Sequence, residues 1–395
     1  MTIDCERSEH MFKRAEKSFL TSWYFEVDRT MIVVVLALML VGMWAAVTAG
    51  SVSAERMNPP QPWHFFFVRM IPFYFLGIGT LIISSMFGRK LIMLTAAANV
   101  IVMGVLLIMT FFEPIVMAKG SARWISVFGF AVTPSDLMKP GFIVITAWFL
   151  DRLGTIAGAG KTIFSMDKKL WRWDGWPAYL LPFSAAVFIM FGHPDIGTAA
   201  LYFAVLAAVL LLAGLPWKLF FALGAVPLVG GIIAFMTWGH FQRRILSFFG
   251  LEGGADTFQL DQSIRAIRHG GLFGAGEDAF VKQSIPDSHT DFIFSAIAED
   301  LGAIAAAILI IVFLYVMKKI RDIAMTARDR FVFYVAGGTL AMFGAQTFIN
   351  IGSSLGVIPT KGMTLPFVSF GGSSFMAFSL MFGILLALAR EDKWK

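Results

Sequence analysis

The segment Pro286-Asp287-Ser288-His289-Thr290-Asp291-Phe292-Ile293-Phe294 marks the point where a long polar loop ends and a hydrophobic helix begins. Asp291 lies at this boundary, and Ser288 and Thr290 just before it carry hydroxyl groups that can cap a helix. Ionisable groups in membrane segments are costly, so a functional role is the default hypothesis for Asp291. The alternative is that Asp291 only caps its helix near the positive end of the helix dipole. The spacing leaves both interpretations open.

The composition identifies the class of protein. Of 395 residues, 57% are hydrophobic and 15% are charged, and the mean hydropathy is +0.74. Together with 41 Phe and 11 Trp, these values predict a polytopic membrane protein with aromatic residues at the interfaces. Cys5 is the only cysteine, which excludes an intramolecular disulfide and a Cys-based zinc site. The six histidines show no metal-ligand spacing, so we predict no metal site. The positions of the basic residues explain the net charge of +6, so we predict no nucleic-acid partner.

Apolar runs of membrane-spanning length recur along the chain. By the ~20-residue criterion, about ten transmembrane helices are expected, and they predict an all-α fold. The runs are 31–50, 65–87, 91–112, 135–152, 176–192, 196–214, 217–238, 291–316, 331–355 and 370–389. Residues 1–30 form a mixed-charge tail, and residues 31–395 are interpreted as a single membrane domain.

The distribution of basic residues predicts the orientation. Loops on one side of the predicted membrane are rich in Lys and Arg, which places them and both termini in the cytoplasm. Two extracytoplasmic segments are exceptions: 113–134, which contains Arg123, and the large loop 239–290 between the seventh and eighth helices, which contains Arg244. An anionic extracytoplasmic ligand would explain basic residues on this side.

The large loop also contains Gln259 and Ser263, followed by the glycine-rich run 270–276. Glycines at this density allow backbone N–H groups to approach phosphate oxygens, and nearby arginines would strengthen such a site. They are equally suited to a tight turn.

Several polar residues lie inside apolar runs. Asp136 and Lys139 are three residues apart, so they share a helix face and can pair. Lys139 and Arg69 can also extend to the interface without any other role. Gln346 and Asn350 face the same way and are expected to hydrogen-bond to neighbouring helices.

Asp195 opens the run 196–214, either as a cap or as an ion-pair partner, with catalysis the less favoured interpretation. Residues 359–367, which include Lys361, are bracketed by two prolines and predict a re-entrant loop. Ser369 and the residues after it then open the last helix with exposed backbone donors.

Four stretches carry a specific resemblance in this order: Pro-Asp-Ile-Gly-Thr (194–198), Gly-Gly-Leu-Phe-Gly (270–274), His-Thr-Asp-Phe-Ile-Phe (289–294) and Pro-Thr-Lys-Gly-Met-Thr-Leu-Pro-Phe-Val-Ser-Phe-Gly-Gly-Ser-Ser (359–374). From about residue 23 to 390, the chain resembles the SEDS family (shape, elongation, division and sporulation). It is more similar to the cell-division type, alphaproteobacterial members in particular, than to the elongation type. Departures from the family pattern fall at His193, Ala275, Asp300, Ser354 and Phe370.

The resemblance implies a ten-helix peptidoglycan glycosyltransferase. It would polymerise lipid II on the outer face of the bacterial inner membrane, at the division septum. Its partners would be a class B penicillin-binding transpeptidase and other division-machinery membrane proteins. The family's catalytic aspartate falls on Asp291. The substrate-binding residues expected from the resemblance and the loops are Arg69, Arg123, Lys139, Arg244, Gln259, Ser263, His289, Thr290, Glu299, Lys361 and Ser369.

The mechanistic hypothesis is an inverting displacement in which Asp291 is the general base. Outer-loop cations, with Mg²⁺ or Mn²⁺ as an optional aid, would neutralise the pyrophosphate leaving group. A lipid II flippase is the alternative, in which Arg69, Lys139, Glu299 and Asp300 line a polar path. Against it, a straight helix places Glu299 only ~12 Å below Asp291, still in the outer half of the membrane. A non-catalytic division scaffold is a third alternative.

Overall fold

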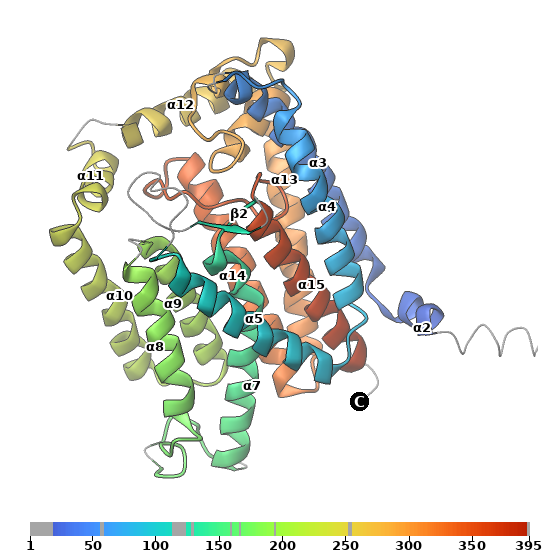
Figure 1. Ribbon diagram of the computed structural model, residues 1–395, viewed down its shortest axis with the longest axis vertical. Helices are drawn as coiled ribbons and strands as arrows, with labels where there is room; N and C mark the ends of the chain where they lie inside the picture. Colours follow the sequence, from blue (N-terminus) through green and yellow to red (C-terminus); the bar gives the residue numbers. More distant parts are fainter. Residues whose placement is uncertain are drawn as a thin grey trace, which may run out of the picture.

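The computed structural model describes residues 19–55, 59–112, 124–127, 130–158, 160–165, 167–192, 195–251 and 255–392. Most of this chain is helical (Figure 1). The apolar helices are α3 (Arg29–Glu55), α4 (Phe65–Ser84), α5 (Arg89–Met109), α7 (Lys139–Ala157), α8 (Trp176–Gly192), α9 (Ile196–Leu212), α10 (Trp217–Thr237), α13 (Ile293–Thr326), α14 (Arg330–Ser354) and α15 (Gly372–Asp392).

Eight of these helices are long and apolar enough to cross a membrane, whereas α8 and α9 are shorter apolar helices of 17 residues each. The prediction of an all-α polytopic membrane protein is therefore confirmed. The count of ten spans stays a prediction, because α8 and α9 fall below the usual spanning length.

The core lies where α14 and α15 meet. Phe343 of α14 packs against Phe382 and Phe378 of α15, with ring centroids 5.2 and 6.0 Å apart. Small residues bring α4 and α15 together: a Cβ atom at Gly77 would collide with Phe375, and one at Gly383 would collide with Ser84. Close contact through small residues is how helices associate in lipid, where the hydrophobic effect between them is weak.

Two local features were not predicted. The apolar run 135–152 begins as a separate turn, α6 (Pro134–Leu137), before α7. Just ahead of it, β1 (Ile125–Val127) and β2 (Phe130–Val132) form a small antiparallel hairpin.

α13 is broken at Gly302, whose φ of 84° and ψ of 173° are not helical. The first part of α13 runs parallel to the end of α14. Asn350 donates to the carbonyl oxygen of Asp291, and one turn further on, the Ser263 hydroxyl contacts both Ser295 and the carbonyl oxygen of Ser354.

Beyond Gly302 the chain runs back down the bundle. Phe313 packs against Phe343, with ring centroids 5.5 Å apart, and Lys319 pairs with Asp28 at 3.0 Å. The prediction of one straight helix over 291–316 was therefore wrong. Glu299 lies farther toward the α12 end of the bundle than Asp291, not beneath it.

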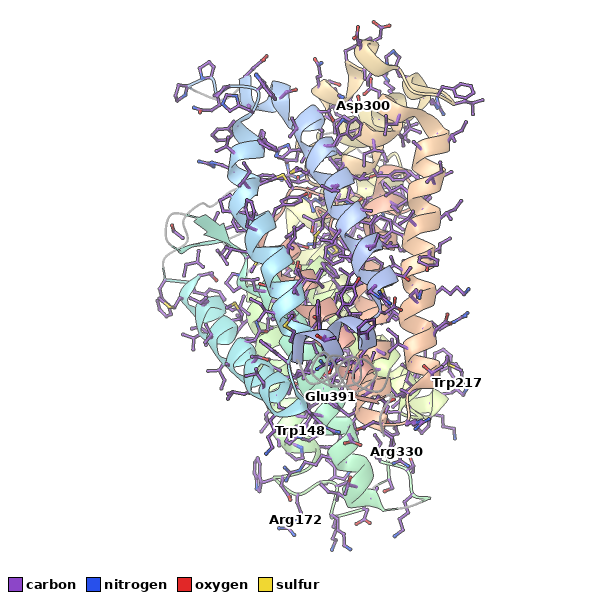
Figure 2. The ribbon with its side chains drawn as sticks, turned by 90° about the vertical axis from the view of Figure 1, so that its right-hand side faces the viewer. Trp148, Arg172, Trp217, Asp300, Arg330 and Glu391 are labelled. Carbon is purple, nitrogen blue, oxygen red and sulfur yellow. The ribbon has the colours of Figure 1, made fainter. Side chains whose placement is uncertain are left out.

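The segment between α10 and α13 contains α11 (Gly239–Phe248), α12 (Ala255–Gly270), and the short 3₁₀ helices η1 (Gly276–Asp278) and η2 (Val281–Ser284). α12 caps one end of the bundle (Figure 1), which we call the upper end. Figure 2 shows Asp300 at this end and Trp217, Arg330 and Glu391 near the opposite, lower end.

The predicted tail 1–30 is described only from residue 19. α2 (Phe19–Glu26) joins the bundle through Trp23, whose indole N–H donates to the Ser85 hydroxyl at 2.9 Å. The lower part of α13 pairs with Asp28, and Arg328 just after it donates through its backbone to Asp392. The two ends of the described chain thus lie on the same side of the bundle.

Candidate active site

Residues 286–292 form an irregular segment that is hydrogen-bonded to α3, to α14 and to the loop before α15. The Ser288 hydroxyl donates to the carbonyl oxygen of Ala49 in α3. The His289 carbonyl accepts from the backbone N–H of Phe370, and the Thr290 carbonyl accepts from the Ser369 hydroxyl at 2.5 Å. These hydrogen bonds satisfy polar groups of the segment and hold it between α3 and the loop before α15.

The predicted capping role for Ser288, Thr290 and Asp291 was wrong. α13 starts after Phe292 and has no side-chain cap. Ser288 binds α3, and the Thr290 hydroxyl donates to the Asp287 carbonyl. The alternative in which Asp291 only caps this helix is therefore excluded. The functional interpretation of Asp291 stays a prediction.

Asp291 is fixed from two sides and is half-buried. Its carbonyl oxygen accepts a 2.9 Å hydrogen bond from Asn350. Its carboxylate lies against Gly362 of the re-entrant loop, so closely that a Cβ atom there would be 2.6 Å from Oδ2. The absence of a side chain at residue 362 makes room for this carboxylate.

Asn350 and Gln346 hold the re-entrant loop in place. The predicted hydrogen bonds to neighbouring helices are present for Gln346, whereas Asn350 donates to the loop and to Asp291. Asn350 donates to the Met363 carbonyl at 2.7 Å, and Gln346 donates to the Thr364 carbonyl at 2.9 Å. Lys139 then donates to Gln346 at 2.7 Å.

The predicted pairing of Lys139 with Asp136 is also confirmed, at 2.6 Å. The Lys139 side chain is only 3% exposed, so it does not extend to the interface. A buried charge is tolerated only when it is paired and hydrogen-bonded, and Lys139 satisfies both conditions. It therefore connects α7 to α14 and, through Gln346, to the loop that contacts Asp291.

Lys361 forms a second ion pair, with Asp195, at 2.7 Å. Asp195 also caps α9 by accepting from the backbone N–H of Thr198, so both roles considered for it from the sequence are present. The Lys361 side chain is 20% exposed and crosses Gly197, where a Cβ atom would be 2.7 Å from Nζ. This pair attaches the re-entrant loop to α9 beside Asp291.

His289 is enclosed by aromatic rings. Its imidazole lies 4.2 Å from the ring of Phe66 in α4 and 5.5 Å from that of Phe370, measured between centroids. Burial lowers the pKa of His289 to about 4, opposed only in part by the nearby Asp287 carboxylate. The imidazole is therefore neutral near pH 7.

Glu299 and Asp300 hold the glycine-rich loop. Glu299 is fully buried and accepts from His269, from the Val281 backbone at 2.8 Å and from the Lys282 backbone at 2.5 Å. Asp300 pairs with the Lys282 side chain. With every interaction directed into the protein, Glu299 has a structural role in place of the predicted substrate contact.

The glycines of that loop serve close packing. Gly274 has a φ of 94° and lies against the carbonyl of Asp300, while Gly302 lies against the carbonyl of Leu272. Of the two interpretations of this loop, the tight turn is the one that the contacts support.

The remaining predicted residues lie in several places. Ser263 is fully buried between Ser295 and Ser354, and Ser369 donates to Thr290, so both are internal contacts and not ligand contacts. Arg69 is exposed on α4 and stacks over Phe65 at 4.4 Å, one turn from Phe66.

The structure does not bring every predicted residue to Asp291. Arg244 lies on α11, and Gln259 lies half-buried on α12. Arg123 lies outside the described residues. Gly362 and Phe66 were missed; the only sequence signal for Gly362 was its place in the motif at 359–374.

In the described part of the chain, no group of three or more His, Cys, Asp or Glu residues converges. The Asp195 carboxylate is engaged by Lys361. The divalent cation stays a prediction, and no step below depends on one.

A match to a known protein family identifies the family of this chain. A model described as "Cell cycle protein" and named for FtsW, RodA and SpoVE matches residues 28–394. The chain belongs to the FtsW/RodA/SpoVE family. This confirms the resemblance to the SEDS proteins drawn from its motifs.

Relatives match along nearly the whole chain. A Caulobacter vibrioides protein named "Probable peptidoglycan glycosyltransferase FtsW" is 34% identical over 388 residues, 97% of this chain and 94% of its own length. An Aliivibrio salmonicida protein of the same name is 29% identical and covers 98% of this chain and 95% of its own.

Solved structures confirm the fold. A chain from "Structural coordination of polymerization and crosslinking by a peptidoglycan synthase complex" has a TM-score of 0.72 at 22% identity, covering 93% of this chain and 99% of that one. Thermus thermophilus rod shape determining protein RodA has a TM-score of 0.62 at 22% identity, covering 93% and 97%.

Proposed function

We propose that this FtsW/RodA/SpoVE family member is a peptidoglycan glycosyltransferase. It polymerises lipid II into β-1,4-linked glycan strands and releases undecaprenyl pyrophosphate. The observation that carries the proposal is the half-buried Asp291 carboxylate, which lies against Gly362. The segment that presents it is hydrogen-bonded to α3, α14 and the loop before α15. The name given to the Caulobacter vibrioides relative supports it.

The proposed reaction needs only one carboxylate, that of Asp291. The 4-hydroxyl of the acceptor sugar attacks the anomeric carbon of the donor, and the bond from that carbon to the pyrophosphate oxygen breaks. The bonding electrons leave with undecaprenyl pyrophosphate, and the hydroxyl proton passes to Asp291. A single displacement converts the α-linked donor into a β-linked product, so one general base is sufficient.

The surrounding hydrogen bonds contribute by holding the base. Asn350 fixes the backbone of Asp291 and the loop beneath its carboxylate with the same amide group. Holding a reacting group in place contributes strongly to rate, and a misplacement of about 1 Å can cost roughly 100-fold. The buried Lys139 supports this arrangement through Gln346.

The leaving pyrophosphate requires positive charge. We assign this role to Arg69, which is exposed on α4. Lys361 is paired with Asp195 and therefore adds little net charge. Cations placed where negative charge develops stabilise the transition state without a proton transfer.

We place the protein in the bacterial inner membrane at the division septum, with the α12 end extracytoplasmic. A class B penicillin-binding transpeptidase and other division proteins are its proposed partners. The FtsW name of the relatives supports the division role, and the "peptidoglycan synthase complex" of the structural match supports a transpeptidase partner.

A lipid II flippase is the second candidate, and the geometry weighs against it. Glu299 and Asp300, which were considered as lining for a transport path, are occupied by contacts with the loop 270–284 at the upper end. A non-catalytic scaffold would not require the Asp291 carboxylate to be held against Gly362.

The test is lipid II polymerisation by purified protein with its cognate transpeptidase, which must contribute no polymerase of its own. Asp291→Asn and Asp291→Ala should reduce the rate by roughly 100-fold or more, the range expected for a general base. Asp261→Asn, the same change at an exposed residue of α12, is the matched control. Near-normal polymerisation by Asp291→Asn would reject the assignment. Absence of polymer from every variant, with lipid II crossing proteoliposome membranes, would favour the flippase.

A further inference from the structure

An open pocket of about 550 Å³ lies between the start of α5 and the second half of α7. Figure 2 shows its Trp148 toward the lower end of the bundle, far from Asp300. The lining residues are Arg89, Lys90, Met93, Trp148, Asp151, Arg152 and Thr155. None of them contributes to the candidate active site, so the pocket requires a separate explanation.

The pocket has an excess of positive charge. Arg89 is already neutralised, because it lies 2.5 Å from Asp329 and 3.7 Å from Asp151. Lys90 and Arg152 are exposed and have no ion pair within the described residues. Two cations at the same pocket therefore remain to bind an anion.

The wall beside these cations is apolar. Met93 and Trp148 line the pocket, and the Arg152 guanidinium lies 5.5 Å from the centre of the Trp148 ring. Farther up α5, Leu94 is 66% exposed. Only 17% of the apolar part of α5 is buried inside the protein, so this helix presents its side to the membrane.

The position of the pocket along α5 matches the head-group region of a membrane. The apolar span of α5 begins at Arg89, and the pocket is built on its first turns. Tryptophan and basic side chains are favoured at this boundary between water and hydrocarbon.

We infer that this pocket binds the head group of an anionic phospholipid, with its phosphate between Lys90 and Arg152 and its acyl chains along the exposed side of α5. Basic pockets between transmembrane helices on the cytoplasmic side bind such head groups. A free phosphate would use the two cations but leave the apolar wall exposed to water, whereas a lipid satisfies both. The inference is independent of the proposed catalytic function.

The experiment measures thermal stability of the purified full-length protein in a neutral detergent against increasing dioctanoyl phosphatidylglycerol. Dioctanoyl phosphatidylcholine tests the charge of the lipid, and glycerol phosphate tests the head group without chains. The test variant is Lys90→Gln/Arg152→Gln. The control is Lys168→Gln/Lys169→Gln, which removes the same charge from exposed residues of the same predicted cytoplasmic side.

Phosphatidylglycerol should raise the Tm of the wild type and of the control in a saturable way, with little effect from the other two compounds. The pocket variant should need roughly tenfold more lipid or more for the same shift, since each nearby cation strengthens binding to anionic lipid about fivefold. An equal loss in the control would show a diffuse charge effect and overturn the inference. Equal stabilisation by glycerol phosphate would show a site for a free phosphate ligand, and an unchanged response in the pocket variant would show that the lipid binds elsewhere.

Discussion

The carboxylate of Asp291 lies directly over Gly362, so that a Cβ atom at residue 362 would be 2.6 Å from Oδ2. These residues come from two irregular segments that meet only in the folded chain. The contact explains why the loop after α14 has a glycine at this position, and it links the loop's geometry to the position of the base.

Gly362→Ala should displace the Asp291 carboxylate and lower the polymerisation rate by about 100-fold, the usual cost of a misplacement of about 1 Å. Gly362 is exposed, so the stability of the protein should hardly change. Lipid II turnover per folded protein, with Tm measured in parallel, tests this. Gly104→Ala is the control, because nothing lies within 4 Å of its added methyl group. Wild-type turnover in Gly362→Ala would contradict the prediction, because it would show that the added methyl group does not displace the Asp291 carboxylate.

The Lys361–Asp195 pair should show energetic coupling. Removing one member of a buried pair leaves an uncompensated charge, and Asp195 is only 3% exposed. Lys361→Met should therefore destabilise the protein by roughly 2–4 kcal/mol, but by clearly less in an Asp195→Asn background. Asparagine is chosen because it retains the ability to cap α9. A double-mutant cycle on thermal unfolding measures the coupling, and additive effects would argue against it.

His289 should make stability depend on pH. Its folded-state pKa of about 4 lies below the ordinary value of 6.5, so the unfolded chain binds more protons between these values. Stability is therefore present above about pH 6.5 and is lost as the pH falls toward 4. At pH 5 the loss is about 2 kcal/mol. The Tm of wild type should fall more steeply from pH 7 to 5 than that of His289→Gln, and parallel curves would contradict the prediction.

Glu299→Gln tests the structural role given to this carboxylate. A neutral amide is a weaker acceptor for the backbone N–H groups of Val281 and Lys282, so the loop 270–284 should loosen. Limited proteolysis or hydrogen exchange should show faster opening there, by roughly tenfold for a loss of about 1.4 kcal/mol. The KM for lipid II should stay near wild type. A raised KM for lipid II without faster opening of the loop would instead support a substrate contact by Glu299.

The sequence predicted contacts that depend on local spacing. Asp136 and Lys139 pair as their three-residue separation requires. Gln346 and Asn350, one helical turn apart, face the same way as predicted, but both donate to the re-entrant loop, whereas neighbouring helices were expected. Gln346 also contacts such helices. The apolar runs likewise located the helices to within a few residues, apart from the ends of α3, α7 and α13.

The main error of the sequence-based prediction concerned the interior of α13. Hydrophobicity continues from 291 to 316, and periodicity therefore predicted a single straight helix. The reversal at Gly302 depends on a positive φ and on close contact with the carbonyl of Leu272. A single glycine in an apolar run does not reveal either feature, since glycine is also common in uninterrupted membrane helices.

By itself, the sequence determined that this is a helical membrane protein of the FtsW/RodA/SpoVE family and which of its polar residues lie on the same helix face. It could do so because apolar length and helical periodicity are properties of continuous segments. Only the tertiary structure decided that Lys361 meets Asp195, 166 residues away, that Gly362 makes room for Asp291, and that Glu299 faces a loop and not a ligand. Those relationships arise from packing between segments that are distant in the sequence. A positive φ or a missing side chain determines how closely two such segments can approach each other.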